Sequence, residues 1–582
     1  MAEKRRPIHT QPKLCDHILR GVANCGVPLR IAASSIPKAG SGLFVINDVA
    51  AGSEIFRSQP VLVVCEGNDL RVCDYCFCNP STRLHPEGRF YSAGEKTVTL
   101  SACTGCKNVE YCSKVGHSLR KVQATATFPN TTLSSQECQS RAWRSYHKHE
   151  CPIVKELLEN KKIMGAVPHA LARLLLWVKK QTMSEDDFAA IVALEHHCDE
   201  RADRWMDRFE NDEDAVLEPT LAMAYQVKQS VNSKLGLGQV QKLACILQHN
   251  AGAIRPPGVL DQYGTFLDLL VSTINHSCDA NTNTFFEGRE LRCRAIKDIP
   301  AGTEITLNYY PTPRFDVLLR RSILDQHMYI KCNCQLCRSE IAEHLAEAPK
   351  RHNHLGKVKE AQDKLDRLGK DALDAFSSSR VLTSCIAFQR QIATLVEKGY
   401  PSGRWPDHIE PLPRILRQLG AMYRELEFAI GLEFELKGTL YVRDKTDPNW
   451  TADFHNLVKH ILFMAQAGDN DIKWVAAESK SVLERADMRY VARGYLIILC
   501  LGARMAFGMD SKFVQALYHW TGDLLECGED AKLHTDLFRE IFEFSQKRLI
   551  EWAEAGVHLA LQLPPREQVA ELEKDIRSLS HD

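Results

Sequence analysis

A block of cysteine and histidine residues between positions 73 and 151 restricts the possible folds of this chain more than any other feature. It contains two C-x2-C pairs, a further cysteine in YC, another in ECQ, and the closing sequence WRSYHKHEC. A tight turn within C-x2-C presents two thiolates to one ion, and four Cys/His ligands complete the tetrahedral shell of structural zinc. The block supplies eight such ligands and therefore predicts two zinc sites.

The separation between the second pair and the terminal His-x3-Cys favours a cross-braced arrangement of the two sites. One ion is expected to bind Cys73, Cys76, Cys112 and Cys138, and the other Cys103, Cys106, His147 and Cys151. Cys78 makes the first pair C-x2-C-x-C, so it remains an alternative to Cys76 as a ligand.

Composition and charge narrow the function classes. The formal net charge is −1, which argues against nucleic acid as the main partner, because a DNA-binding surface usually carries a basic excess. No apolar stretch approaches the ~18 residues needed to span a bilayer, and the N-terminus lacks a signal-peptide core. We therefore expect an intracellular protein, in the nucleus or the cytoplasm, whose 21 cysteines stay reduced and available to metals.

The length of 582 residues predicts several domains rather than a single core. Strand-like segments at 29–65 and 282–309 are separated by the zinc block and by helix-like sequence from 152 to about 249. This order indicates one β-rich domain with insertions. From about 340 to the end almost everything is helix-like, without a clean repeat period, although stacked helix pairs would fit.

A second cysteine cluster, KCNCQLC, supplies Cys332, Cys334 and Cys337. Three thiolates are one ligand short of a closed tetrahedral zinc site, so a fourth ligand from elsewhere in the chain is expected.

Residues 73–151 resemble a MYND finger, a small zinc module that binds partner proteins, often through proline-rich peptides. The family writes Y-C-S-K-x-C-Q, whereas this chain separates YCSK from ECQ, and removing Val115 to Gln136 restores YCSKECQ. The first residue of that segment can be encoded by GTN and the last by CAG, the ends expected of an intron read through in frame. We interpret 115–136 as a translated intron or else a disordered insertion, which must loop out if Cys112 and Cys138 share a metal.

Five short segments carry a wider resemblance: KAGSGLFV at 38–45, LQHN at 247–250, NHSC at 275–278, AGTEITLNYY at 301–310 and KCNCQLC at 331–337. In this order, with the MYND block after the first strands, they resemble the SET domain of the SET-and-MYND-domain (SMYD) protein methyltransferases. The resemblance covers roughly 29–337 and is weaker for the tail, which in that family is a TPR-like helical domain.

The resemblance implies an α+β fold with a β-rich SET core (a β-clip with a pseudoknot) and an all-α C-terminal domain. The implied segments are 1–28 as an N-terminal extension, 29–72 as the first part of SET, 73–151 as the MYND finger, 152–249 as a helical insert, 250–310 as the SET core, 311–340 as a post-SET zinc segment and 341–582 as the TPR-like domain.

The resemblance also assigns a site for S-adenosylmethionine (SAM). Gly40, Ser41 and Gly42 would place backbone against the cofactor, since glycine lets a ligand approach without a Cβ in the way. The side chains expected to contact the amino-acid end and the adenine of SAM are Asn250, Asn275 and His276. Tyr309 matches the catalytic tyrosine and is expected at the cofactor as well.

The same comparison implies that NHSC threads beside the loop that holds this tyrosine. Cys278 would then be the fourth ligand of the zinc bound by KCNCQLC, so three structural zinc ions are expected in all. The implied activity is SAM-dependent methylation of a protein lysine, histone or non-histone, by a monomer whose MYND finger recruits protein partners.

The chain departs from the family pattern at three positions. Ser41 stands where many relatives have asparagine, and Ala280 replaces the proline of D-P-N. Ile330 stands where relatives usually have an aromatic residue that lines the lysine channel, a gap that Tyr329 or Tyr310 would have to fill. Two alternatives therefore stay open: an adaptor with a catalytically weak or inactive SET core, and a scaffold built on the helical tail.

Overall fold

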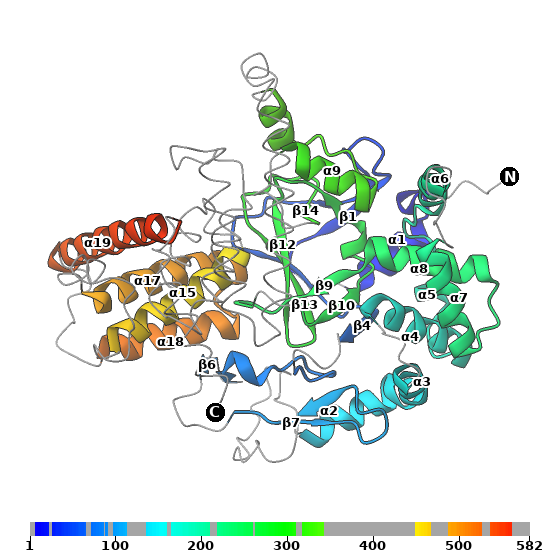
Figure 1. Ribbon diagram of the computed structural model, residues 1–582. Coiled ribbons are helices and arrows are strands. Elements are labelled where there is room, and N and C mark those ends of the chain that lie inside the picture. Colours follow the sequence, from blue (N-terminus) through cyan, green and yellow to red (C-terminus); the bar gives the residue numbers. More distant parts are fainter. Residues whose placement is uncertain are drawn as a thin grey trace. The chain divides into compact units, whose positions relative to one another are not determined.

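The computed structural model describes residues 6–21, 26–65, 71–85, 88–90, 97–112, 135–159, 165–209, 218–259, 262–309, 317–342, 448–466, 487–526 and 536–561. The chain forms two compact units, shown as ribbons in Figure 1. The first comprises Met1–Tyr310, Leu324–Cys332 and Arg504–His519, and the second comprises Pro311–Ile323, Asn333–Ala503 and Trp520–Asp582.

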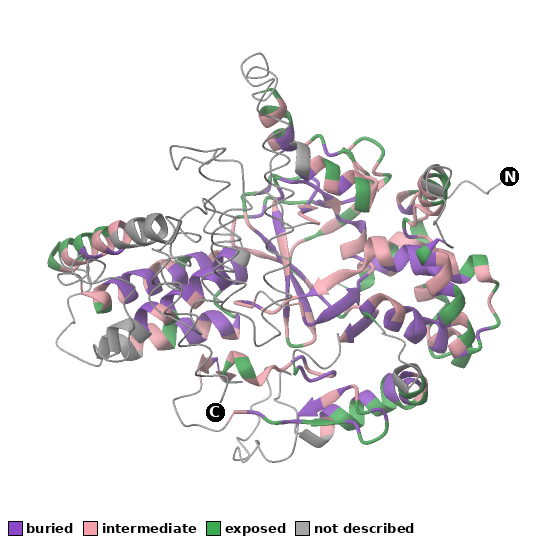
Figure 2. Ribbon diagram, viewed as in Figure 1, coloured by how far each residue is buried: buried purple, intermediate pink, exposed green. Residues whose placement is uncertain are grey.

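Short antiparallel sheets form the β-rich core of the first unit. One sheet is the hairpin β1–β2, a second has the order β12–β13–β3, and a third has the order β4–β10–β9. Strands β2, β4, β10 and β13 are almost entirely buried, as Figure 2 shows. The bounds are β1 (Leu29–Ala33), β2 (Ser41–Val45), β3 (Glu54–Ser58), β4 (Leu62–Cys65), β9 (Gly252–Ile254), β10 (Gly264–Leu267), β12 (Thr282–Glu287) and β13 (Glu290–Ala295).

One parallel pair crosses this core and brings two distant motifs together. β11 (Asn275–His276) pairs with β14 (Thr306–Leu307), and Ser277 extends the pairing by donating its N–H to the Leu307 carbonyl at 3.0 Å. Parallel strands require a long crossover connection, which the hairpin β12–β13 supplies here. The NHSC segment therefore runs directly beside the ITLNY segment, as the sequence analysis expects.

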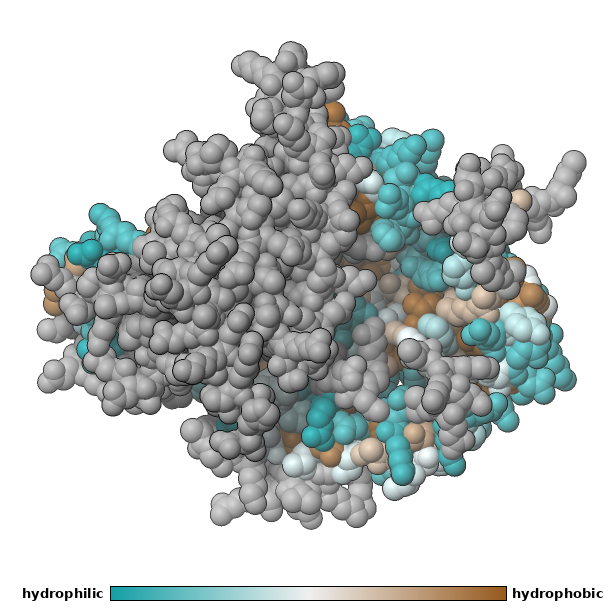
Figure 3. All heavy atoms as spheres, viewed as in Figure 1, coloured by the Kyte–Doolittle hydropathy of each residue, from teal (hydrophilic) through white to brown (hydrophobic). Residues whose placement is uncertain are grey.

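A group of helices lies on one side of this core, where α4 packs against β4 and β10 and the helices α7 and α8 pack against α4 (Figure 1). The central one, α4, is buried around almost its whole circumference from His169 to Leu176, since it packs against α7 and α8 as well as the strands. On the face drawn in Figure 3, the described surface around these helices is largely hydrophilic with scattered apolar residues. The helices are α4 (Ala166–Lys180), α5 (Glu185–Val192), α6 (Cys198–Phe209), α7 (Pro219–Val231) and α8 (Leu237–Asn250).

The zinc block of the first unit combines two small hairpins with one long interrupted helix. The hairpins are β5 (Leu84–His85) with β6 (Arg89–Phe90) and β7 (Leu100–Ala102) with β8 (Glu110–Cys112). The helix consists of α2 (Ser135–Ala142), a π-helical turn at Trp143–His147 and α3 (Lys148–Glu159). Residues 113–134, which hold most of the proposed intron, lie outside the described part of the chain.

A buried ionic network joins α3 to α4. The carboxylate of Glu150 accepts hydrogen bonds from His169 and Arg173, and all three side chains are almost inaccessible to solvent. Arg173 also donates to the carbonyl of Val63, and its guanidinium lies 3.8 Å from the ring centroid of Tyr146. Burial alone would raise the pKa of Glu150, but the charge of Arg173 and the two hydrogen-bond donors lower it to about 2.

The second unit is helical where it is described. Aromatic side chains connect its helices. The ring centroid of Tyr495 on α17 lies 5.1 Å from that of Phe454 on α15 and 6.1 Å from that of Phe542 on α19. The helices are α15 (Pro448–Gln466), α17 (Met488–Phe507), α18 (Lys512–Glu526) and α19 (Asp536–Leu561), of which the end of α17 and the start of α18 belong to the first unit.

Helix α17 is the one described helix that is long and apolar enough to cross a membrane. The expectation that no segment approaches such a length is therefore wrong in its literal form. However, 61% of the apolar window is buried inside the protein, because α17 packs against α15, α18 and α19. Buried core helices meet the same criteria of length and composition, so this is weak evidence for a membrane span.

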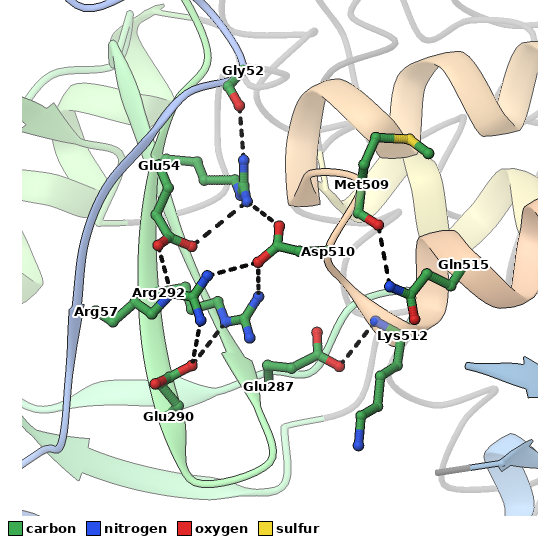
Figure 4. Close-up of polar contacts among 11 residues, drawn as sticks. Gly52, Glu54, Arg57, Glu287, Glu290, Arg292, Met509, Asp510, Lys512 and Gln515 are labelled. Carbon is green, nitrogen blue, oxygen red and sulfur yellow. Dashed lines mark hydrogen bonds and ion pairs between the residues drawn. The ribbon is translucent and has the colours of Figure 1, made fainter. Parts of the chain in front are cut away.

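The turn between α17 and α18 belongs to the first unit, although the sequence analysis places it in the helical tail. Asp510 accepts hydrogen bonds from Arg57, Arg292 and Arg294, which come from β3 and β13 (Figure 4). Glu54 and Glu290 complete this ionic cluster, and Lys512 donates its backbone N–H to Glu287 at 3.2 Å. Phe507 and Phe513 add apolar contacts, the first with Phe285 and the second with Phe90.

The mixture of strands and helices and the helical C-terminal region agree with the expected α+β class. The strand-like sequence from 54 to 65 forms two strands in different sheets, β3 paired with β13 and β4 paired with β10, and Pro60, which has no N–H to donate, lies between them. Helix α9 (Val317–Met328) precedes the second cysteine cluster. Residues 343–447 of the tail lie outside the described part, so the TPR-like arrangement stays a prediction.

Candidate functional site

The two predicted ligand sets of the zinc block each come together in space. In the first set, the Sγ atoms of Cys73, Cys76, Cys112 and Cys138 lie within 4.8 Å of one another. Cys112 and Cys138 stand on opposite sides of the proposed intron and nevertheless meet. Cys78 is not part of this group of four, although its thiol is hydrogen bonded to Cys112. Four thiolates in a mostly buried cluster are a donor set that fits zinc.

The second set consists of Cys103, Cys106, His147 and Cys151, all buried. Nε2 of His147 lies 3.2 Å from Sγ of Cys103 and 3.6 Å from Sγ of Cys106, so this nitrogen faces the ligand cluster. The π-helical turn moves His147 relative to Cys151 on the long helix, and such turns often occur where a helix must present a functional side chain. This set also fits a tetrahedral zinc ion.

The third set joins Cys278 to Cys332, Cys334 and Cys337, whose Sγ atoms again lie within 4.8 Å of one another. Hydrogen bonds lead from this set to Tyr309. The backbone N–H of Tyr309 donates to Nδ1 of His276 at 3.1 Å, so Nδ1 must be the bare nitrogen. The proton is then on Nε2, which points at Sγ of Cys278 at 3.3 Å. His276 thus connects a predicted zinc ligand to the backbone of the predicted catalytic residue.

The Gly40–Gly42 loop meets the NHSC segment through Asn275. The Asn275 amide nitrogen lies 2.8 Å from the carbonyl of Ser41 and 2.8 Å from the carboxylate of Glu304. A Cβ on Gly42 would come within 2.2 Å of that carboxylate, so any other residue here would displace the hydrogen-bonded Glu304 side chain. Gly40 has φ +73°, and a Cβ there would meet nothing within 4 Å, so its Cα faces open space. A ligand can approach the backbone at Gly40, as the predicted contact with SAM requires.

Glu304 holds the loops of this site together, and the sequence analysis assigns it no role. Its carboxylate accepts hydrogen bonds from the hydroxyl of Ser34 at 2.7 Å and from the N–H and hydroxyl of Ser35 at 2.7 and 2.6 Å, in addition to Asn275. The side chain is buried. The available sequence signal was an acidic residue inside the strand-like segment AGTEITLNYY, where an unpaired charge would be costly.

Tyr309 is held in a defined position. Its hydroxyl donates to the carbonyl of Ile274 at 2.6 Å, and its ring lies 5.3 Å from that of His276. Burial, together with the nearby charge of Glu304, raises the pKa of Tyr309 well above its ordinary value. The phenol therefore stays protonated at neutral pH and offers oxygen lone pairs as hydrogen-bond acceptors. Beside it, Oδ1 of Asn308 is buried without a hydrogen-bond partner.

Asn250 lies at the C-terminus of α8. Its amide nitrogen donates to the carbonyls of Glu195 at 2.7 Å and Ile246 at 2.9 Å, which uses both of its hydrogens. Only its carbonyl oxygen is then available to a ligand. Its predicted contact with SAM stays a prediction.

Tyr329 and Ile330, the two residues just before KCNCQLC, have well-defined neighbours. The ring of Tyr329 stacks on that of His197 at 5.1 Å and lies edge-on to His249, while the guanidinium of Arg204 lies 4.3 Å from its centroid. Tyr329 has φ +57°, a left-handed conformation that is unusual for tyrosine. Ile330 donates its N–H to Leu324 at 3.2 Å. Tyr310, the other residue considered for the lysine channel, lies outside the described residues.

Comparison with known proteins shows what the region that carries this site resembles. Residues 40–310 match the family model of the SET domain. Human "Histone-lysine N-methyltransferase SMYD3" is 23% identical over 315 residues, covering 54% of this chain and 62% of the relative. "Histone-lysine N-methyltransferase ASHR1" of Arabidopsis thaliana is 25% identical over 321 residues, covering 53% and 55%.

A third relative, "SET domain and MYND-type zinc finger protein 6" of Schizosaccharomyces pombe, is 25% identical over 319 residues, covering 53% of this chain and 52% of the relative. The chain thus aligns with somewhat more than half the length of the curated relatives it matches.

Proposed function

We propose that this chain is a SAM-dependent protein-lysine methyltransferase. The premise is that residues 40–310 match the SET family model and that the chain is similar to the SMYD proteins over about half its length. The observation that carries the proposal is the meeting of three motifs. Asn275 binds the Gly40–Gly42 loop, and the next residue, His276, binds the backbone of Tyr309. No purely structural role requires these separate segments to converge on one partly buried tyrosine.

The residues present fit SAM. The open side of Gly40 allows backbone contact, and the unpartnered Oδ1 of Asn308 is a buried acceptor near Tyr309 that a bound amine or amino group would satisfy. When bound, SAM supplies a methyl group on a positively charged sulfur. Gly40, Ser41, Gly42, Asn250, Asn275 and His276 are the residues that would hold it.

Tyr309 would orient the substrate amine. A lysine amine must be neutral to act as a nucleophile, and an apolar channel lowers its pKa by disfavouring the charged form. Because the Tyr309 hydroxyl donates a hydrogen bond to the carbonyl of Ile274, the lone pairs of its oxygen can accept a hydrogen bond from the incoming amine. The chain therefore contributes alignment and a polar acceptor rather than a strong base.

The zinc block would recruit protein partners as a MYND finger. The naming of the fission-yeast relative supports this assignment, as do the two complete sets of zinc ligands. Trp143 on the π-helical turn is 46% exposed, which provides an apolar contact for a peptide. The substrate would be a histone or another lysine-containing protein, met in the nucleus or the cytoplasm by a monomeric enzyme.

The alternative is a SET–MYND adaptor with weak or no catalysis. Ile330, in place of the usual aromatic residue, is the observation that favours it. Calorimetric titration of zinc-replete protein with SAM, followed by transfer of labelled methyl groups to core histones and to a panel of lysine-containing proteins, separates the two.

The proposal expects SAM binding by the wild type, its loss in Asn275→Ala, and normal SAM binding by Tyr309→Phe with kcat lowered about 10²-fold or more. Metal analysis of each variant shows whether the zinc sites have survived. Absence of SAM binding by wild-type protein with all its zinc would refute the enzyme and favour the adaptor.

A further inference from the structure

The N-terminal segment Arg6–Arg20 lies outside the residues that match the SET family model, yet it is part of the core. It consists of the 3₁₀ turn η1 (Ile8–Thr10) and the helix α1 (Pro12–Arg20). Ile8 and Ile18 are 3% and 4% exposed and belong to the main hydrophobic cluster. The turn η1 contacts both β1 and β2, the hairpin that carries the Gly40–Gly42 loop.

His9 in this turn binds the side chain of Ser41. The backbone N–H of His9 donates to Oγ of Ser41 at 3.1 Å, and Nδ1 of the ring lies 3.0 Å from the same oxygen. A serine hydroxyl has one hydrogen and two lone pairs, so it can accept from the backbone N–H and still form the second bond with the ring nitrogen. The two contacts fix the direction of the Ser41 side chain.

Ser41 is therefore held from two sides. Its side chain is bound by His9, and its backbone carbonyl accepts from the Asn275 amide at 2.8 Å. Ser41 links the N-terminal segment to NHSC across the middle residue of the predicted cofactor loop. A loop held at both its backbone and its side chain is already ordered before a ligand arrives, which reduces the entropy lost on binding.

The segment has independent anchors that keep His9 in place. Sγ of Cys15 donates to the carbonyl of Ile8 at 3.2 Å, which ties the turn to α1. At the other end of α1, Nε2 of His17 lies 2.9 Å from Oδ1 of Asp187 on α5. The turn is thus fixed to the hairpin on one side and to the helical insert on the other.

We propose that Arg6–Arg20 is an N-terminal strap on the cofactor loop and that His9 is a positioning residue, acting through Ser41, for SAM binding. This inference rests on the proposed function. The strap gives the short, polar Ser41 side chain a partner at the position where many relatives carry asparagine. It makes residues outside the SET domain part of the cofactor site.

The test is a double-mutant cycle on SAM affinity with His9→Ala, Ser41→Ala and the double variant, measured by calorimetry on full-length, zinc-replete protein. Ser41→Ala removes both contacts, whereas His9→Ala removes only the ring contact and keeps the backbone N–H, so we expect SAM to bind about three- to tenfold more weakly in each, with Ser41→Ala the weaker binder. The double variant should be no weaker than Ser41→Ala, because the residues act as one unit. His9→Asn should recover most of the affinity, since its amide places a polar atom at the position of Nδ1.

Two controls separate positioning from a general loss of structure. Thr10→Ala changes the neighbouring exposed residue, whose hydroxyl binds only the local carbonyl of Pro7, and should leave affinity unchanged. For His9→Ala the KM for SAM should rise while kcat at saturating SAM stays constant. Hydrogen exchange should show faster exchange at the amides of 38–44 in the free variant and not elsewhere in the SET domain.

The outcomes distinguish this inference from the proposed function. Wild type that binds SAM together with unchanged affinity in His9→Ala would overturn the strap and leave the enzyme intact. Tighter binding by His9→Ala would also overturn it, because His9 would then compete with the cofactor. A fall in kcat and affinity together, unrescued by His9→Asn, would show a merely structural role. Absence of SAM binding by wild type would overturn both proposals.

Discussion

Replacing Asp510 with alanine tests whether a turn far along the sequence is required for the stability of the β-rich core of the first unit. The carboxylate of Asp510 accepts hydrogen bonds from three guanidinium groups, those of Arg57, Arg292 and Arg294, of which Figure 4 labels the first two. The side chains of Arg292 and Arg294 are only 4% and 7% exposed, so water cannot replace the lost carboxylate. The change leaves two buried positive charges with fewer partners on β13.

The expected cost follows from those remaining partners. Removing one member of a fully buried ion pair costs about 3–5 kcal/mol. Here Arg292 keeps Glu290 at 3.1 Å, and Arg294 keeps Glu54 at 3.6 Å together with the carbonyl of Gly52. Asp510 itself is 43% exposed, which further weakens its contribution. We therefore expect the free energy of opening of β3 and β13 to fall by about 3 kcal/mol, the lower end of the range for a buried ion pair.

Native-state hydrogen exchange measured on peptides from β3 and β13 is the appropriate assay, because a chain of two units need not unfold in one step. A loss of about 3 kcal/mol lowers protection of these amides about 10²-fold. Asp510→Asn, which keeps one acceptor oxygen, should give an intermediate value. Asp536→Ala, an 85% exposed aspartate paired with Arg539, is the control and should change nothing there. Less than a threefold change in Asp510→Ala would refute the reasoning.

Three further changes test other parts of the structure. Arg173→Met should destabilise the junction of α3 and α4 by about 3–5 kcal/mol in urea unfolding, because it leaves the Glu150 carboxylate buried and unpaired; adding Glu150→Gln should restore part of the loss, and an effect below 1 kcal/mol would contradict this. Burial raises the pKa of Tyr495 to about 12, so the neutral phenol contributes fully to the free energy of unfolding below pH 10. Between pH 10 and 12 the free energy of unfolding should fall by about 2–3 kcal/mol, and Tyr495→Phe should lack this fall when unfolding is measured at each pH. Cys278→Ser should remove one equivalent of zinc by metal analysis and weaken SAM binding, because Cys278 contacts the ring that holds the Tyr309 backbone; an unchanged zinc content would exclude it as a ligand.

Local sequence was sufficient to predict the zinc chemistry and the motifs of the site. Cysteine pairs two residues apart in C-x2-C can reach one ion whatever surrounds them, so spacing alone groups most of the ligands. The structure brings together all three predicted sets, including Cys112 with Cys138 and Cys278 with the KCNCQLC cysteines. The motif KAGSGLFV likewise indicated the role of Gly42. The close approach of the Glu304 carboxylate gives the physical reason for a glycine at this position.

Contacts between distant segments could not be read in the same way. Glu304, Ser34 and Ser35 form a polar centre beside the Gly40–Gly42 loop, but each has an ordinary local sequence. Their role depends on the parallel pairing of β11 with β14, which places Asn275 beside Thr306. Sequence periodicity predicts which face of a helix or strand is apolar, but it does not predict which polar residues of different strands form hydrogen bonds with each other.

The sequence by itself thus indicated the sets of candidate metal ligands, the alternation of strand and helix, and the motifs that resemble a SET domain, because each depends on spacing along a few residues. Tertiary structure alone decided that His9 binds Ser41 and that Asp510 binds three arginines of the β-rich core, more than 200 positions away. Such pairs form only when folding buries charged and polar groups that must then find partners, and the partner is chosen by proximity in space rather than by position in the chain.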